Sequence, residues 1–157
     1  MYLIVLTIHN IVRWLVIIFA TLALIRMVSG WAGRRAWSKA DDQAGILFTS
    51  MLDLQVLVGL VLYFFFSPAT TALLTGTANT SSPLVRFFGI EHILWMLVGV
   101  VVAHIGRVVS KKASTSIAKF SRATILYTLA IVIILVAIPW PFSPISRPWL
   151  RFGTMGF

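Results

Sequence analysis

The sequence predicts an all-α protein built as a bundle of four transmembrane helices. Mean hydropathy is +0.97 over 157 residues, of which 59% are hydrophobic and only 11% are charged. A water-soluble domain of this size typically has about a quarter of its residues charged, and it has too little interior for so much apolar surface. Four apolar stretches have about the length, roughly 20 residues, that is needed to cross a hydrocarbon core of about 30 Å. The lipid bilayer is therefore the expected solvent for most of the chain.

The predicted spans cover residues 1–27, 46–66, 84–107 and 123–140, and together they form a single membrane domain of residues 1–157. The first span has no basic segment before it and is longer than the apolar core of a signal peptide. We therefore expect it to be a retained membrane helix.

The links between the spans differ in composition. The first, residues 28–45, and the third, residues 108–122, are polar and basic, whereas the second, residues 67–83, is rich in Thr, Ser and Ala. After Trp140, prolines alternate with aromatic residues, and this pattern is too rich in proline to continue a helix. We expect residues 141–157 to form an interfacial aromatic tail at the lipid headgroups.

The basic residues predict the orientation of the bundle. Nine of the thirteen lie in or beside the first and third links: Arg26, Arg34, Arg35, Lys39, Arg107, Lys111, Lys112, Lys119 and Arg122. Arg86, Arg147 and Arg151 lie on the other side, and Arg13 lies within a span. By the positive-inside rule, both basic links face the cytoplasm. Both termini are then expected on the outer, periplasmic side of a bacterial cytoplasmic membrane.

The net charge of +9 and the absence of cysteine limit the expected partners. Basic residues that set membrane orientation and attract anionic lipids do not form a nucleic-acid surface, so we expect no nucleic-acid partner. Without cysteine, no disulfide, iron–sulfur cluster or covalently attached c-type haem can form, whereas b-type haem and quinone are still compatible with the sequence. No phosphate-binding loop, metal motif or nucleophile with a recognisable base occurs. We expect no catalytic site, no metal site and no independent enzymatic activity.

Ionisable residues inside the spans mark polar sites, because each one is costly in hydrocarbon. At a rise of about 1.5 Å per residue, Arg13 lies about 18 Å from the outer end and Asp53 about 10 Å from the inner end, which is nearly the same level. We therefore expect a buried ion pair between Arg13 and Asp53; protonation of Asp53, or its pairing with Arg26, is the alternative. His104 lies about 30 Å from the outer end and is expected at the cytoplasmic interface.

His9 and His92 also share a level, each about 12 Å below the outer end. Two imidazoles at one level on neighbouring helices match the ligands of a b-type haem in a helix bundle. The structural alternative is a polar network in which the rings hydrogen-bond to each other, to Glu91 or to backbone carbonyls. Glu91 can also pair with Arg86, just over one turn away, or face a partner subunit.

Two further patterns concern the helix faces. Gln55, Gly59 and Tyr63 form a stripe on the second span that fits either a quinone headgroup or ordinary interhelical packing. Gly99 and Ala103 give the third span a small-residue stripe, which a flat macrocycle or another helix can approach closely. The fourth span has few polar groups and is expected to be a wall that faces lipid or a partner.

Four short strings, one for each span, form a familiar combination: HNIVRW at 9–14, DLQVLVGL at 53–60, RFFGIEH at 86–92 and IPWPF at 138–142. Together they resemble small four-helix bacterial membrane proteins that are labelled cytochrome b-like. The resemblance covers nearly the whole chain, and it implies that His9 and His92 occupy the HxxxRW and EH positions of that family. Some relatives have His where this chain has Asp53, so the resemblance implies no ligand role for that helix.

A chain with so little outside the bilayer also resembles the small accessory subunits of respiratory or photosynthetic complexes such as alternative complex III. We therefore expect a small accessory subunit of a bacterial electron-transport complex, with other membrane subunits, lipids and quinone as partners. One alternative is a b-type cytochrome with haem between His9 and His92. Another is a small transporter component, which is disfavoured because no span is interrupted by the Pro or Gly pairs that build midplane substrate sites.

Overall fold

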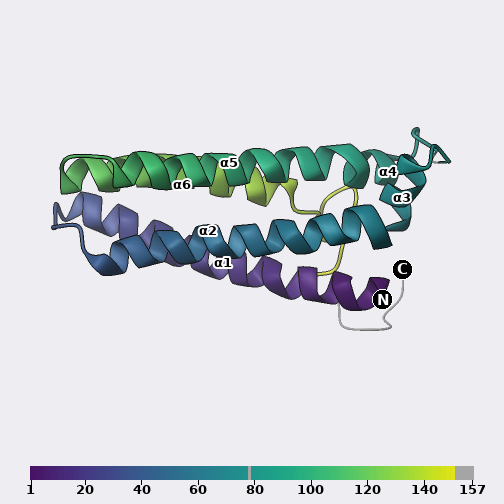
Figure 1. Ribbon diagram of the computed structural model, residues 1–157, viewed down its shortest axis with the longest axis horizontal. Helices are drawn as coiled ribbons and strands as arrows, with labels where there is room; N and C mark the ends of the chain where they lie inside the picture. Colours follow the sequence, from purple (N-terminus) through teal and green to yellow (C-terminus); the bar gives the residue numbers. More distant parts are fainter. Residues whose placement is uncertain (78, 151–157) are drawn as a thin grey trace.

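The computed structural model describes residues 1–77 and 79–150, and every regular element in this part of the chain is helical (Figure 1). The elements are α1 (Tyr2–Ala32), α2 (Lys39–Val61), the π-helical turn η1 (Leu62–Phe66), α3 (Pro68–Leu74), α4 (Pro83–Arg86), the π-helical turn η2 (Phe87–Glu91), α5 (His92–Lys111) and α6 (Ser116–Ala137). Within residues 1–77 and 79–150, four continuous helical segments are long and apolar enough to cross a membrane. The predicted all-α bundle with four spans is therefore confirmed.

Each helical segment extends beyond the predicted apolar stretch toward the first or the third link, whereas the fourth ends at Ala137, three residues before its predicted end. The four segments have 31, 28, 29 and 22 residues. Hydropathy measures only the part that lies in hydrocarbon, whereas capping groups decide where a helix begins. Thr115 accepts a hydrogen bond from the backbone N–H of Ala118 and begins α6. Ser38 precedes α2, and its backbone N–H and hydroxyl both donate to Asp41.

The helices pack in a ring in which α1 contacts α2, α2 contacts α5, α5 contacts α6 and α6 contacts α1. The helices α1 and α5 are consequently diagonal partners rather than neighbours. The N-terminus, α3 and α4 lie at one end, which we call the N-terminal end (Figure 1). The short connections 33–38 and 112–115 lie at the other end, which we call the basic end.

Small residues on α5 bring it close to α6. Gly99, Ala103, Gly106 and Ser110 are all buried. A Cβ atom at Gly106 would lie 2.8 Å from Cβ of Leu126, so only glycine fits this contact. The predicted stripe of small residues therefore faces another helix, and no macrocycle is needed to explain it.

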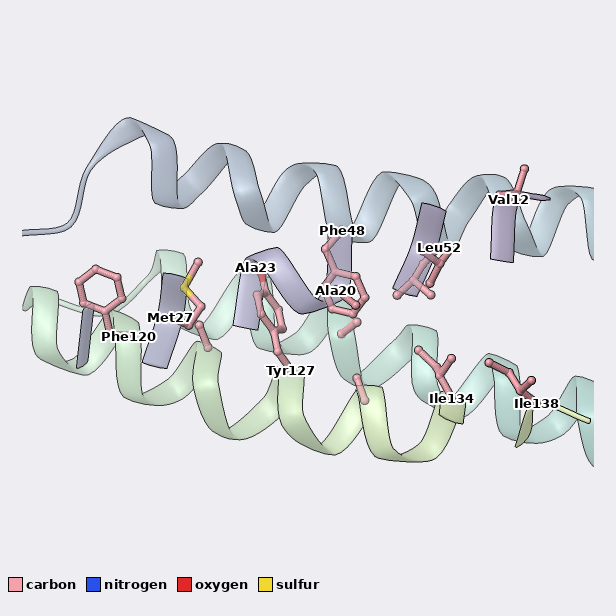
Figure 2. Packing of buried hydrophobic residues seen from close by; sticks show 14 residues of the cluster. Val12, Ala20, Ala23, Met27, Phe48, Leu52, Phe120, Tyr127, Ile134 and Ile138 are labelled. Atoms are coloured by element: carbon pink, nitrogen blue, oxygen red, sulfur yellow. The ribbon is translucent and has the colours of Figure 1, made fainter. Parts of the chain in front are cut away.

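The core lies between α1, α2 and α6 (Figure 2). Phe48 of α2 packs edge-on against Tyr127 of α6, with ring centroids 5.2 Å apart. Met27 and Phe120 are also fully buried, toward the basic end. α6 buries a larger share of its apolar window than any other span does, and Ile125, Leu129 and Val136 are exposed on it, so it contributes to the core in addition to the outward face that the sequence predicted.

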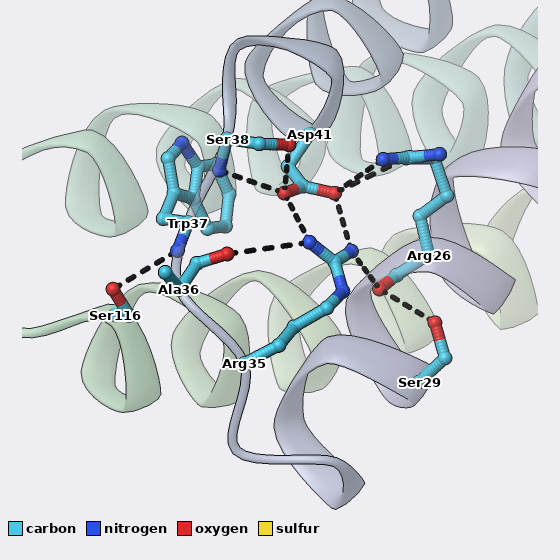
Figure 3. A network of polar contacts seen from close by, with 8 residues as sticks. All are labelled: Arg26, Ser29, Arg35, Ala36, Trp37, Ser38, Asp41 and Ser116. Carbon is cyan, nitrogen blue, oxygen red and sulfur yellow. Dashed lines mark hydrogen bonds and ion pairs between the residues drawn. The ribbon is translucent and has the colours of Figure 1, made fainter.

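A charged cluster joins the first link to the ends of α1 and α2 (Figure 3). Asp41 is completely buried and accepts hydrogen bonds from Arg26 at 3.1 Å, from Arg35 at 2.6 Å, and from the backbone N–H of Ser38 at 2.9 Å. The hydrogen bond to Asp41 raises the pKa of Arg35, so its guanidinium stays charged. Arg35 also lies over the ring of Phe120, 4.7 Å from its centroid.

Candidate functional site

The polar residues singled out in the first three spans gather mostly at the N-terminal end of the bundle. His92 shows the depth of this site along the bundle, because its Nδ1 is 2.9 Å from the carbonyl oxygen of Ala137, the last residue of α6. A helix of 22 residues is about 33 Å long, which is close to the thickness of the hydrocarbon layer. His92 thus lies level with an end of α6, and so near an edge of that layer rather than 12 Å inside it, because α6 ends at Ala137, three residues before the predicted end of the fourth span.

His9 and Gln55 form the centre of the site. The amide nitrogen of Gln55 is 3.1 Å from Nε2 of His9. If this amide donates, the ring proton of His9 is on Nδ1. Both Nδ1 of His9 and the amide oxygen of Gln55 are buried and have no hydrogen-bond partner among the described residues. The site therefore presents one donor and one acceptor that the protein leaves unused.

Gly59 makes room for the His9 ring. It lies one helical turn beyond Gln55, and a Cβ atom there would lie 3.2 Å from Cε1 of His9. This distance is tighter than most side-chain contacts, so an added methyl group would displace the imidazole by a few tenths of an ångström. Two members of the predicted Gln55, Gly59 and Tyr63 stripe thus touch the same histidine.

Arg13 lies one turn below His9 and is held by the C-terminal tail. Its Nη2 donates to the carbonyl of Trp149 at 2.6 Å and to the side chain of Asn10 at 3.4 Å. The indole N–H of Trp14 donates to the same Trp149 carbonyl at 3.0 Å. The Nε atom of Arg13 is buried and has no partner in the described part of the chain. Arg13 therefore adds a second unused donor near His9.

Asp53, which was predicted to pair with Arg13, is paired instead with His104. Oδ1 of Asp53 lies 2.8 Å from Nε2 of His104. The two predicted levels were counted from span ends that differ from the helix ends, and the tail offers Arg13 a closer partner. His104 precedes the end of α5 by seven residues, so it lies about 10 Å inside the helix rather than at its end.

The tail folds back over the N-terminal end of α1. Trp140 is nearly parallel to Phe142, with 6.1 Å between ring centroids, and Trp149 lies 5.3 Å from Trp140. The guanidinium of Arg147 lies 5.2 Å from the centre of the Phe88 ring. The tail is non-helical, as predicted, but residues 141–150 cover the site in addition to any contact with headgroups. Residues 151–157, including Arg151, lie outside the described residues.

His92 follows directly on the π-helical turn η2. Within this turn, the carbonyl of Gly89 accepts a hydrogen bond from the Tyr63 hydroxyl at 2.8 Å, which joins η2 to η1. Glu91 pairs with Arg86 at 2.7 Å, which is the local pairing that the sequence suggested. The ring of His92 packs beside those of Phe87 and Phe88, at centroid distances of 5.7 and 6.0 Å. The turn thus sets the position of His92, and the contact with Ala137 orients its imidazole.

The sequence prediction missed the part of the site that the tail provides. The carbonyl of Trp149 and the rings of Trp140 and Trp149 complete the surroundings of Arg13. The only available signal was the alternation of proline and aromatic residues after α6, which predicts a non-helical apolar segment but not its contacts. Among the described residues, no group of three His, Asp or Glu side chains is arranged to hold a metal ion.

The chain matches no protein-family model, and no curated protein or solved structure is significantly similar to it.

Proposed function

We propose that this protein is a small accessory subunit of a bacterial electron-transport complex, and that its N-terminal end binds the headgroup of a quinone. One observation carries the proposal. Nδ1 of His9, the amide oxygen of Gln55 and Nε of Arg13 are all buried without a partner in the described structure. Buried polar atoms are normally hydrogen-bonded, and leaving one unpaired costs free energy. A polar ligand that pairs with these atoms would remove that cost.

A quinone has the matching chemistry. Its two carbonyl oxygens accept hydrogen bonds, and the hydroxyls of the reduced quinol donate them. The N–H groups of His9 and Arg13 supply donors, and the amide oxygen of Gln55 supplies an acceptor. The site lies near an edge of the apolar layer, so an isoprenoid chain could extend into lipid while the ring stays at the polar atoms.

The accessory role follows from what surrounds this site. The chain has four spans, short connections and no recognisable catalytic group, so a redox partner must supply the electrons. Other membrane subunits and lipids are the partners that this composition favours. The clustered basic residues favour a cytoplasmic basic end, which puts the N-terminal end on the periplasmic side of a bacterial cytoplasmic membrane.

Quinone affinity tests the site directly. Trp14, Trp140 and Trp149 adjoin the site, so a short-chain quinone is expected to quench tryptophan fluorescence of the purified protein on titration. Gln55→Leu is expected to weaken binding about tenfold, which corresponds to the loss of one buried hydrogen bond. Gln43→Leu replaces the other glutamine, which is exposed near the basic end, and should leave the affinity unchanged. Equal affinity in both variants would contradict the assignment.

Purification in mild detergent tests the accessory role. Native electrophoresis with mass spectrometry is expected to show redox subunits that migrate with the protein, and solvent extraction should recover quinone. If the protein isolated from its native membrane carries no redox subunit, the accessory role is wrong even when the isolated chain binds quinone.

The geometry of His92 favours b-type haem as the second candidate. Its Nδ1 faces a backbone carbonyl, which fixes the ring proton there and leaves the Nε2 lone pair available, as in many metal-ligating histidines. His9 fits less well, because Gln55 occupies its Nε2. If haem is bound, it supplies one-electron transfer, and His9 and His92 would hold it from the diagonal helices α1 and α5.

A reduced-minus-oxidised visible spectrum separates the two candidates. If haem is present, His92→Ala is expected to abolish the low-spin α band, whereas His104→Ala, on a histidine outside the site, should retain it. Protein from haem-replete cells that lacks a Soret band excludes the haem candidate and leaves the quinone site unaffected.

A further inference from the structure

We propose that the outer face formed by α2 and α5 is a contact surface between two copies of this chain, which meet through Asp53 and His104. This proposal does not depend on the ligand at the N-terminal end. It rests on a polar pair that faces outward from the bundle at a depth where the surroundings are hydrocarbon.

Among the described residues, Asp53 and His104 form the only contact between an acidic and a basic side chain in the middle of the spans. Their side chains are 56% and 43% exposed, although their mutual contact is 2.8 Å. His104 lies twelve residues beyond His92, which corresponds to about 18 Å from the N-terminal edge of the apolar layer. Ionisable groups at such depth almost always face protein or a water-filled cavity. A protein surface is therefore expected to cover this pair.

Most of the rest of the face is apolar. Leu57 of α2 and Val101 of α5 are 61% and 54% exposed, and Ile105 and Val108 extend the surface along α5. A shallow open cavity of about 430 Å³ follows α5 beside His104. Its lining residues are Val100, Val101, His104, Ile105, Val108 and Val109. This surface combines one polar pair with apolar side chains and a depression that another helix can fill.

The polar pair is complementary to itself. No described residue bonds to Oδ2 of Asp53 or to Nδ1 of His104, so each pair retains one acceptor and one ring nitrogen. When the imidazole is protonated, both ring nitrogens donate. A twofold axis beside the pair would let His104 of each copy donate to Asp53 of the other, since a symmetric interface uses the same patch twice. Acyl chains offer no such groups, so lipid cannot satisfy the pair.

Disulfide cross-linking in native membranes tests the surface. The natural chain has no cysteine, so each introduced thiol is unique. Val101→Cys is expected to give a cross-linked homodimer on mild oxidation. Leu129→Cys is the control, because Leu129 is similarly exposed but lies on α6. Its depth is also similar: Leu129 precedes Ala137 by eight residues, and Val101 follows His92, which lies level with Ala137, by nine. A dimer yield for Val101→Cys no higher than for Leu129→Cys would overturn the proposal.

Variants of the pair test its chemistry. In the cysteine-free chain, Asp53→Leu and His104→Leu are each expected to weaken dimerisation in detergent about tenfold, because each removes two symmetry-related polar contacts. Sedimentation equilibrium measures the dissociation constant, and an unchanged circular dichroism spectrum verifies the fold. An unchanged dissociation constant overturns the role of the pair. A cross-link from Val101→Cys exclusively to a different protein overturns the homodimer.

Discussion

Replacing Asp41 with alanine is expected to lower the free energy of unfolding by about 3 kcal/mol, the largest loss from any single charge in the protein. Asp41 is fully buried and is shared by Arg26, Arg35 and Ser38 (Figure 3). Its removal leaves two guanidinium groups without their common partner and takes the capping carboxylate from α2. The two arginine side chains are about 40% exposed, so their charged groups regain some water, which keeps the expected loss at the lower end of the range for broken buried pairs.

Thermal unfolding in mild detergent measures this effect. A loss of about 3 kcal/mol corresponds to a fall in Tm of about 6–12 °C for a chain of this size. Asp42→Ala is the matched control, because the neighbouring carboxylate is 37% exposed and lies 3.7 Å from Arg107. It is expected to change the free energy of unfolding by less than about 1 kcal/mol. Similar Tm values for the two variants would show that the cluster does not stabilise the fold.

Substitution of Gly30 by alanine is expected to destabilise the protein by about 2 kcal/mol, through overpacking at the basic end. Gly30 is buried near the end of α1 against the ring of Phe120, and a Cβ atom there would overlap the ring, lying 2.6 Å from Cδ1. The sign of the change in the free energy of unfolding is diagnostic, because alanine in place of glycine inside a helix otherwise stabilises the protein by about 1 kcal/mol. The steric clash must therefore exceed the gain in helix propensity.

A double-mutant cycle isolates this contact. Phe120→Leu shortens the side chain that the new methyl group meets, so Gly30→Ala is expected to cost at least about 1 kcal/mol less in the Phe120→Leu background. The neighbouring Ser29→Ala replaces an exposed side chain and is expected to change stability by less than about 0.5 kcal/mol. Strict additivity of the two substitutions would contradict the proposed steric contact.

Hydropathy predicted the four spans, because a helix that crosses hydrocarbon must carry an apolar stretch of nearly fixed length. It did not predict the helix ends, which depend on single capping side chains such as Thr115 and Asp41. It also did not predict which helices adjoin, and depth alone does not separate neighbouring helices from diagonal ones. His9 and His92 were thus assigned to the correct end of the bundle but to neighbouring helices, whereas α1 and α5 are diagonal.

The ion pairs show where counting along the chain is insufficient. On the sequence alone, Asp41 belongs to the polar link of residues 28–45, although the spacing of Ser38 and Asp41 is that of a capping box. Its burial depends on Arg26 and Arg35, which lie on the other side of the turn. Arg13 and Asp53 had nearly equal predicted depths, yet each found a different partner. Depth brings two groups to one level, but the direction in which each side chain leaves its helix decides the contact.

The hydrogen bond from Arg13 to the carbonyl of Trp149 joins residues 136 positions apart. During synthesis, α1 enters the membrane before the segment that contains Trp149 leaves the ribosome. The polar site is consequently incomplete until all four spans are in place, and any ligand that needs Arg13 held in this geometry can be acquired only after insertion has finished. Assembly of the site therefore reports that the four spans and the segment that reaches Trp149 have been made and inserted.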